Sequence, residues 1–186
     1  MDALARLDAR LFVLLNASGR HPLLDVFLPL VTQFKLFVAP LALAWIVLFW
    51  KGDRRARVLL VFLLAGVGLS DLVASHVVKH LVARVRPCHV LPAYVYFSCK
   101  QSPSMPSSHA TNFACAAVLL GACYRRWIPL FALAALVVGY SRIYVGLHYP
   151  GDVLAGYVLG AAIGGGVLFV ARRAAGPRAA PGSGQR

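Results

Sequence analysis

Charge, and acidic charge above all, is scarce in this sequence. Charged residues make up 13% of the 186 residues and only 6 are Asp or Glu, whereas 60% are hydrophobic. A water-soluble domain of this length has no core large enough to bury so much apolar surface, so the composition excludes an ordinary soluble protein and predicts lipid as the solvent. The length corresponds to about one domain.

Several other features are missing. The first ten residues, Met1 to Arg10, contain Asp and Arg and no small-residue cleavage site after an apolar run, so we expect no secretory signal peptide. No internal repeat is evident, and no platform of aromatic and basic residues predicts nucleic-acid binding despite the net charge of +13. Basic loops that set membrane topology and meet anionic lipid head groups explain this charge better.

The four cysteines fall into two pairs. Cys115 and Cys123 lie in an apolar stretch and are predicted to be buried thiols. Cys88 and Cys99 flank a polar loop and can form a disulfide if that loop faces an oxidising compartment. A zinc site with His89 is the disfavoured alternative, because no second closely spaced ligand pair accompanies these residues. The sequence leaves the disulfide open.

Five apolar runs approach the roughly 20 residues that a helix needs to cross a bilayer. They are Thr32–Trp50, Val58–Leu81, Ser107–Tyr124, Trp127–Val145 and Gly151–Ala171. Leu4–Asn16 alternates apolar with charged residues, which predicts an amphipathic helix on the membrane surface. His21–Val31 contains Asp25 and two prolines and is interpreted as a shallow or re-entrant helix, so five or six crossings are compatible with the sequence. The predicted fold is an all-α, polytopic membrane helical bundle.

Loop charges predict how this bundle is oriented. Basic residues follow the first, third and fifth spans: Lys51, Arg54, Arg55, Arg57, Arg125, Arg126, Arg172 and Arg173. The positive-inside rule places these ends in the cytoplasm, and the loops Val82–Pro106 and Gly146–Pro150 on the opposite side, which is the periplasm in a bacterium. Residues 1–173 are predicted to form one membrane-embedded domain. Residues 174–186, rich in Gly, Pro, Ala and Arg, are predicted to be a disordered cytoplasmic tail.

Ionisable side chains gather at one membrane face in this topology. They come from the ends of four different helices: Lys79, Arg84, Arg86, His109, Arg142, His148 and Asp152. Charged groups near lipid are costly and are therefore candidates for function. Asp152 is the only acidic residue expected near this cluster, so no carboxylate cluster predicts a metal site.

The cluster suits a phosphate group. Pro106-Ser107-Ser108-His109 leads directly into a helix, whose first backbone N–H groups are unpaired and favour an anion. Lys79, Arg86 and Arg142 can supply positive charge to the phosphoryl oxygens. The pattern predicts a site for phosphoryl transfer.

Two histidines can carry the chemistry. His148 precedes Asp152 by four residues. A carboxylate bonded to one ring nitrogen leaves the other nitrogen free as a nucleophile. His109 can then protonate the leaving oxygen.

Each of these residues, taken alone, has an ordinary structural explanation. Terminal Lys and Arg side chains often extend to the membrane interface. A histidine near a helix end is usually satisfied locally, and Ser after Pro is a common helix cap. Only the combination at one face favours a functional site.

Three motifs in this order resemble those of the type-2 phosphatidic acid phosphatase family, the lipid phosphate phosphatases. The first is Lys79, six residues, then Arg86-Pro87; the second is Pro106-Ser107-Ser108-His109; the third is Ser141-Arg142, five residues, His148, three residues, then Asp152. The second departs at Ser108, where the family most often has Gly. Because a small residue is retained, the departure concerns substrate preference more than activity.

The resemblance implies a role for each site residue. His148 is the nucleophile that becomes phosphorylated, Asp152 orients it, and His109 is the general acid. The phosphate-binding residues are Lys79, Arg86, Ser107, Ser108 (through its backbone N–H) and Arg142. The family requires no metal, so neither a metal nor another cofactor is expected.

The resemblance also implies an integral membrane lipid phosphatase with the bilayer and a lipid phosphate or diphosphate as partners. Its candidate substrates are undecaprenyl diphosphate, lipid A 1-phosphate, phosphatidylglycerol phosphate and phosphatidic acid. The alternative is a non-catalytic anionic-lipid binding or transport protein. A vanadate-dependent haloperoxidase shares the anion-binding motifs, but such enzymes are soluble and five spans argue against it.

Three further features receive interpretations. Asp71, inside the second span, is predicted to make a structural hydrogen bond with Ser70 or a neighbouring helix. Arg84 is a candidate for contact with a second phosphate or a sugar. Gly156, Gly160 and Gly164 have a spacing of four, which predicts close packing against another helix.

Overall fold

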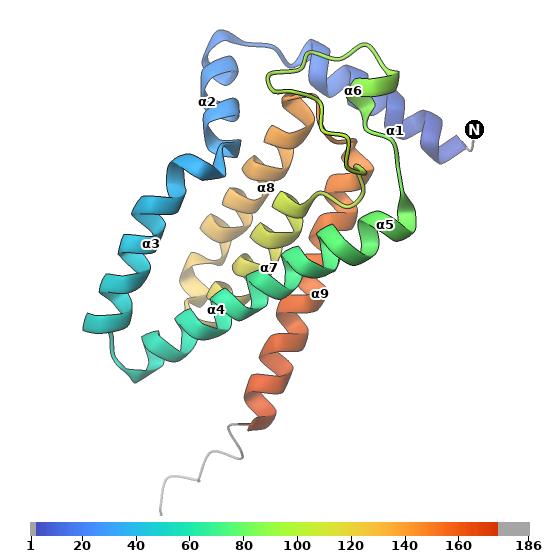
Figure 1. The fold of residues 1–186 in the computed structure, drawn as a ribbon. Helices are drawn as coiled ribbons and strands as arrows, with labels where there is room; N and C mark the ends of the chain where they lie inside the picture. The colour runs from blue at the N-terminus through green and yellow to red at the C-terminus, as the bar shows by residue number, and fades with distance from the viewer. Residues whose placement is uncertain (1–2, 175–186) are drawn as a thin grey trace, which may run out of the picture.

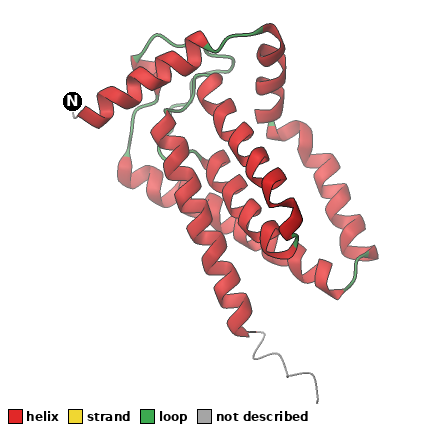
Figure 2. Cartoon of the chain, turned by 180° about the vertical axis from the view of Figure 1, so that it is seen from behind, coloured by secondary structure: helices red, strands yellow, loops and turns green. Residues whose placement is uncertain are grey.

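The computed structural model describes residues 3–174, and all regular secondary structure in this range is helical (Figures 1 and 2). This confirms the predicted all-α membrane bundle. The predicted tail lies outside the described residues, apart from Ala174 at the end of the last helix.

The N-terminal region has two parts. Helix α1 (Ala3–Val13) continues into a π-helical turn, η1 (Leu14–Ser18), and this segment corresponds to the predicted amphipathic helix. Helices α2 (Pro22–Thr32) and α3 (Phe34–Lys51) follow, and they meet at a bend of 54°. The predicted first span began at Thr32, but this residue ends α2.

The second span is longer than predicted. Helix α4 (Arg54–Leu72) starts early because Asp53 caps it, accepting a hydrogen bond of 2.8 Å from the backbone N–H of Ala56. It continues through η2 (Val73–Val78), which is π-helical, into α5 (Lys79–Val82). The chain then turns at Ala83, whose φ is +48°. Lys79 therefore lies on the last turn of a long rod.

Three helices complete the bundle: α7 (Ser108–Cys123), α8 (Ile128–Tyr144) and α9 (Pro150–Ala174). A short helix, α6 (Pro87–Val90), lies in the loop before α7, and a 3₁₀ turn, η3 (Arg125–Trp127), precedes α8. Figure 1 shows α7 surrounded by α4, α8 and α9, with α1 and α6 above the end of the bundle where α9 begins.

Within the described residues, three helical segments are long and apolar enough to cross a membrane: Arg54–Val90, Arg125–Tyr144 and Pro150–Arg173. The bent pair of α2 and α3 adds a fourth if it is one broken span. Helix α7 is apolar but has only 16 residues. The multi-pass architecture is thus clear, and the number of crossings stays a prediction.

Glycines bring α9 against α7, as their spacing predicted. A Cβ at Gly156 would lie 2.8 Å from the carbonyl oxygen of Ser107, and one at Gly160 would lie 2.1 Å from that of Thr111. Gly164 is 3.1 Å from the Cys115 carbonyl by the same measure. This stripe fixes the first turns of α7 against α9, where two of the three motifs meet.

The prediction for Asp71 is also confirmed. Its carboxylate accepts a hydrogen bond of 3.1 Å from the side-chain amide of Asn112, which lies on the neighbouring helix α7. Ser70 donates to the same amide group at 2.7 Å. These bonds join α4 to α7 below the cluster of ionisable residues.

Candidate active site

The structure brings the ends of four helices together, as the sequence predicted. Lys79 lies on α5 at the end of the long rod, Arg142 lies near the end of α8, and Asp152 lies in the first turn of α9. The N-terminus of α7 faces them. These three charged side chains are all buried, so the site is a charged interior rather than a group of solvated helix ends.

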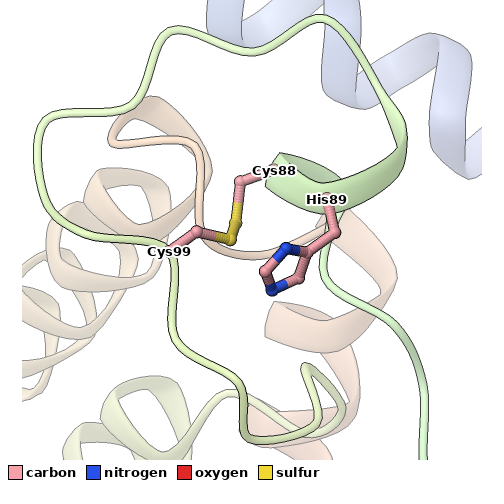
Figure 3. A group of neighbouring side chains, drawn as sticks. All are labelled: Cys88, His89 and Cys99. Carbon is pink, nitrogen blue, oxygen red and sulfur yellow. A yellow bond between two sulfur atoms is a disulfide. The ribbon is translucent and has the colours of Figure 1, made fainter.

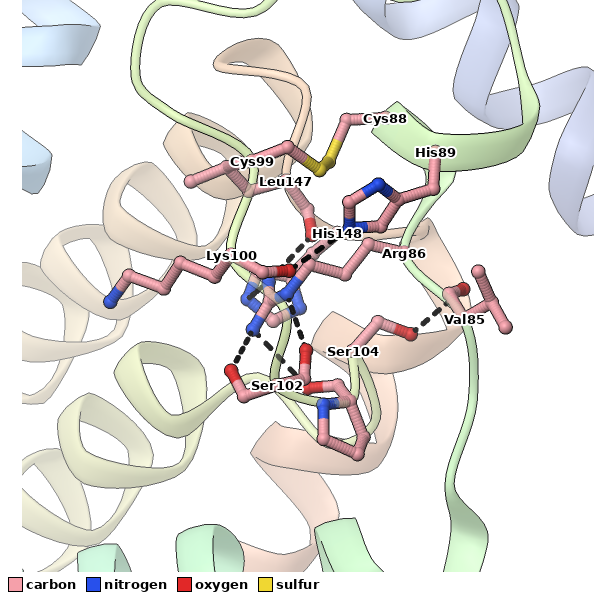
Figure 4. The surroundings of a disulfide bond; sticks show 11 residues. Val85, Arg86, Cys88, His89, Cys99, Lys100, Ser102, Ser104, Leu147 and His148 are labelled. Carbon is pink, nitrogen blue, oxygen red and sulfur yellow. Dashed lines mark hydrogen bonds between the residues drawn. A yellow bond between two sulfur atoms is a disulfide. The ribbon is translucent and has the colours of Figure 1, made fainter.

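Arg86 is buried in this site, with 2% of its surface exposed. Its Nε donates to the carbonyl of Ser102 at 2.8 Å, and its Nη1 donates to the carbonyl of Leu147 at 2.9 Å. Its Nη2 donates to the Ser102 hydroxyl and the Pro103 carbonyl, both at 3.2 Å (Figure 4). These neutral acceptors fix the guanidinium, and none of them offsets its positive charge.

The geometry defines the tautomer of His148. Nη1 of Arg86 lies 3.1 Å from Nε2 of His148 (Figure 4). A guanidinium can only donate, so Nε2 is the unprotonated acceptor and the ring proton lies on Nδ1. Nδ1 in turn lies 3.5 Å from Oδ2 of Asp152. The nitrogen that carries a lone pair therefore faces the cationic cluster, while the protonated nitrogen faces the carboxylate.

Burial lowers the pKa of His148 well below its usual range, and the positive charges of Arg142 and Arg86 add to this effect. His148 is 3% exposed. A histidine with a lowered pKa stays neutral at physiological pH, which is the form that a nucleophile requires.

The start of α7 forms the anion-binding side. Ser107 is the residue before the helix, and its own N–H donates to the carbonyl of Asp152 at 3.0 Å, which ties α7 to α9. The N–H groups in the first turn of a helix have no intrahelical partner. The hydroxyl of Ser108 lies 3.0 Å from that of Ser75, so its side chain faces η2 and only its backbone N–H remains for the predicted phosphate contact. His109 follows in the first turn, within electrostatic range of Arg142 and His148.

Predicted site residues also carry unusual unpaired atoms. In the described part of the chain, four buried side-chain nitrogen or oxygen atoms lack a hydrogen-bond partner: Ser107 Oγ, Arg142 Nε, His148 Nδ1 and Arg20 Nη1. Such atoms are rare and costly. Three of the four belong to residues that the motifs assign to phosphate binding or catalysis. Arg142 uses Nη1 to bond the Thr32 hydroxyl, which leaves Nε available.

The structure corrects the interpretation of Arg84. Its Nη1 pairs with Oδ1 of Asp152 at 2.8 Å, and its Nη2 pairs with Oδ2 of Asp8 at 2.7 Å. Its guanidinium also lies over the ring of Tyr149, 3.9 Å from the centroid. Arg84 is thus engaged by protein carboxylates rather than placed for a second phosphate or a sugar. Asp8 is a second acidic residue beside the site, so Asp152 is not alone there.

Cys88 and Cys99 form a disulfide (Figure 3), which settles the choice that the sequence left open. With His89 they are also the group of described residues that could hold a metal ion, but sulfur atoms in a disulfide are not thiolate ligands. The ring of His89 lies 3.1 Å from the carbonyl of Lys100. The disulfide therefore closes, with a covalent bond, the loop that lies between Arg86 and its acceptors Ser102 and Pro103.

Lys100 is a residue that sequence reasoning missed. It follows Cys99 in the outer loop (Figure 4). Partial burial lowers its pKa, and the charges of Arg142 and Arg86 lower it further. The pattern of motifs gave no signal for it, because it lies between two motifs. It brings another cation to the phosphate-binding side.

A family model described as the PAP2 superfamily matches residues 56–174, a segment that contains every predicted site residue. The chain belongs to the PAP2 superfamily. This match confirms the resemblance to the type-2 phosphatidic acid phosphatases that the three motifs predicted.

Individual relatives of this PAP2 protein agree. It is 28% identical to a lipid A 4'-phosphatase of Porphyromonas gingivalis, over 88% of this chain and 72% of the relative. It is 38% identical to a decaprenylphosphoryl-5-phosphoribose phosphatase of Mycobacterium tuberculosis, over 66% of this chain and 68% of the relative. The crystal structure of Aquifex aeolicus LpxE superposes with a TM-score of 0.74 at 28% identity, covering 88% of this chain and 95% of that one. The protein is therefore a multi-pass member of a family of membrane lipid phosphatases.

Proposed function

We propose that this PAP2 protein hydrolyses a phosphate monoester or diphosphate on a lipid head group through a phosphohistidine on His148, without a metal. The observation that carries the proposal is the arrangement around His148. Its Nε2 accepts from Arg86, its Nδ1 faces Asp152, and the unpaired Ser107 Oγ and Arg142 Nε lie on residues of the same site.

The first step transfers the phosphoryl group to the protein. Arg86 transfers its Nη1 hydrogen bond from Nε2 of His148 to a phosphoryl oxygen, and the freed lone pair of Nε2 attacks phosphorus while the bond between phosphorus and the leaving oxygen breaks. His109 gives its proton to that oxygen, so the dephosphorylated lipid, or the lipid monophosphate in the case of a diphosphate, leaves as a neutral hydroxyl or a protonated phosphate. Asp152 stabilises the positive charge that develops on the ring through Nδ1.

The second step restores the protein. A water molecule attacks the phosphorus of phosphohistidine, His109 takes its proton, and the bond from phosphorus to Nε2 breaks with the electron pair returning to the ring. Inorganic phosphate leaves. Lys79, Arg86 and Arg142 hold the phosphoryl oxygens in both steps, together with Ser107 and the backbone N–H groups at the start of α7.

The composition of the site supports chemistry without a metal. Three cations, Lys79, Arg86 and Arg142, converge where a metalloenzyme would place carboxylates to bind its ions. The carboxylate of Asp152 accepts a hydrogen bond from Arg84 and one from the backbone N–H of Tyr149 at 2.9 Å. Its oxygens are thus occupied by the protein.

The candidate substrates are undecaprenyl diphosphate, lipid A 1-phosphate, phosphatidylglycerol phosphate and phosphatidic acid. The cation of Lys100 supports those with a second anionic group next to the reacting phosphate, because Lys79, Arg86 and Arg142 already balance one phosphoryl group. A diphosphate meets this condition best.

We also propose that the protein lies in a bacterial inner membrane with the site facing the periplasm. The basic ends of the first, third and fifth predicted spans support this orientation. The Cys88–Cys99 disulfide supports it independently, since it lies on the site side of the bundle and disulfides persist in oxidising compartments.

The test is phosphate release from the four lipids in detergent with excess chelator, comparing the wild-type protein with His148→Ala. We expect release by the wild type and none by the variant. Equal release from both proteins would contradict the role of His148. Binding that survives in His148→Ala, with no release by either protein, would favour the lipid-binding or transport alternative.

A further inference from the structure

The surface helix α1 makes a polar contact with the proposed catalytic apparatus. Oδ1 of Asp8 accepts from the backbone N–H of Gly151 at 2.8 Å, in the first turn of α9. Oδ2 of Asp8 pairs with Nη2 of Arg84 at 2.7 Å. The carboxylate of Asp8 thereby joins Arg84, which lies within the first motif, to the helix that carries Asp152.

Arg84 connects Asp8 to Asp152. Its Nη1 lies 2.8 Å from Oδ1 of Asp152. Because Oδ1 is held by Arg84, the carboxylate plane is fixed and Oδ2 is directed toward Nδ1 of His148, 3.5 Å away. The backbone N–H of Tyr149 supports Oδ2 at 2.9 Å. The chain of contacts thus runs from Asp8 through Arg84 and Asp152 to the nucleophile.

Apolar contacts enclose this chain. Phe12 of α1 is fully buried and packs edge-on against Tyr149, with 5.6 Å between ring centroids. The guanidinium of Arg84 lies over the same Tyr149 ring, 3.9 Å from its centroid. The side chain of Asp152 is 0% exposed and those of Asp8 and Arg84 are 15% and 23% exposed. Ion pairs that are shielded in this way are held in one geometry and are screened less by solvent.

We propose that Asp8 and Arg84 are positioning residues for Asp152, so that α1, lying on the membrane surface, is part of the catalytic apparatus. This inference rests on the proposed function, in which Asp152 orients His148. Arg84 suits the role because the two ends of its planar guanidinium contact two carboxylates at once, which a lysine cannot do.

The consequence for catalysis follows from geometry. The reacting nitrogen must lie within a few tenths of an ångström of its productive position, and misplacement by about 1 Å costs roughly 10²-fold in rate. Loss of Asp8 frees one end of Arg84 and loosens Asp152 without removing any phosphate-binding group. The turnover number should fall, while substrate binding should be retained.

The experiment compares Asp8→Asn, Arg84→Lys and the double variant with the wild type, on the fastest lipid substrate in detergent. Asp8→Asn keeps an oxygen for Gly151 and loses the charge that faces Arg84. The matched control is Asp53→Asn, which removes a capping carboxylate at the far end of α4. Activity is expressed per monodisperse protein, so that loss of folded protein does not count as loss of turnover.

We expect kcat to fall about tenfold in Asp8→Asn and more in Arg84→Lys, with KM changed by less than about twofold in both. Because Asp8 acts through Arg84, the double variant should be no slower than Arg84→Lys alone. Asp53→Asn should keep the wild-type kcat, because the amide oxygen of Asn can still cap α4.

Two results would overturn the inference: a wild-type kcat in Asp8→Asn, or effects of the two substitutions that multiply in the double variant. Either result, together with an inactive His148→Ala protein, would leave the proposed function intact. A wild-type protein that releases no phosphate from any of the lipids would overturn both proposals.

Discussion

Replacement of Gly160 by Ala should distort the active site from a distance. A Cβ at this position would lie 2.1 Å from the carbonyl oxygen of Thr111 and 3.0 Å from Cβ of Ala114, whereas ordinary contacts begin at 3.4 Å. The neighbour is backbone, so α7 and α9 must separate locally by about 1 Å. Overpacking of this kind costs roughly 1–3 kcal/mol of stability.

The same displacement moves the phosphate-binding end of α7, because Thr111 lies in the first turn next to Ser107 and His109. A shift of about 1 Å there should lower kcat/KM by roughly 10²-fold. Phosphate release and the thermal unfolding temperature in detergent measure the two effects. The control is Gly165→Ala on the same helix, where no atom lies within 4 Å of the added Cβ; it should keep full activity. Equal behaviour of the two variants would refute the reasoning.

Three further predictions concern the site itself. Because burial and nearby cations lower the pKa of His148, its ring should stay neutral with the proton on Nδ1 at about pH 6, below the usual pKa of ~6.5; ¹⁵N shifts of labelled histidine, assigned by the signal lost in His148→Asn, check this, and a protonated ring would contradict it. Lys100→Gln should raise KM for a lipid diphosphate severalfold more than for a monophosphate, and equal changes would remove Lys100 from the head-group site. Joint replacement of Cys88 and Cys99 by Ser should loosen the segment between Arg86 and its acceptors in Ser102 and Pro103 and lower activity severalfold, as reductant should for the wild type; an unchanged double variant would show that the disulfide is dispensable.

The order of the motifs and the predicted spans were sufficient to predict that the motif residues meet at one end of the bundle. Lys79, His109 and His148 lie far apart in the chain, yet the topology that follows from the apolar runs places them at one face. Helix α7 begins at Ser108, next to its predicted start, because its apolar periodicity is a local signal, whereas α4 begins at Arg54, before the predicted Val58, because Asp53 caps it.

The contacts that depend on tertiary packing were not predictable. Nothing in the surface helix predicts that Asp8 reaches Arg84, because this pairing requires α1 to lie against the start of α9. The same holds for Lys100, whose loop has no periodic pattern, and for the Ser108 side chain, which turns toward Ser75 instead of the phosphate side. Such contacts arise from how rigid elements meet, whereas sequence patterns report each element separately.

The stereochemical course at phosphorus tests the central claim most directly. The substrate would be a lipid phosphate made chiral with three oxygen isotopes, and the protein would transfer its phosphoryl group to an acceptor alcohol in place of water. The configuration of the product would be determined by ³¹P NMR. Two successive in-line displacements, first by His148 and then by the acceptor, each invert phosphorus, so the account predicts overall retention. Overall inversion would mean direct attack on the lipid phosphate and would contradict a phosphohistidine intermediate.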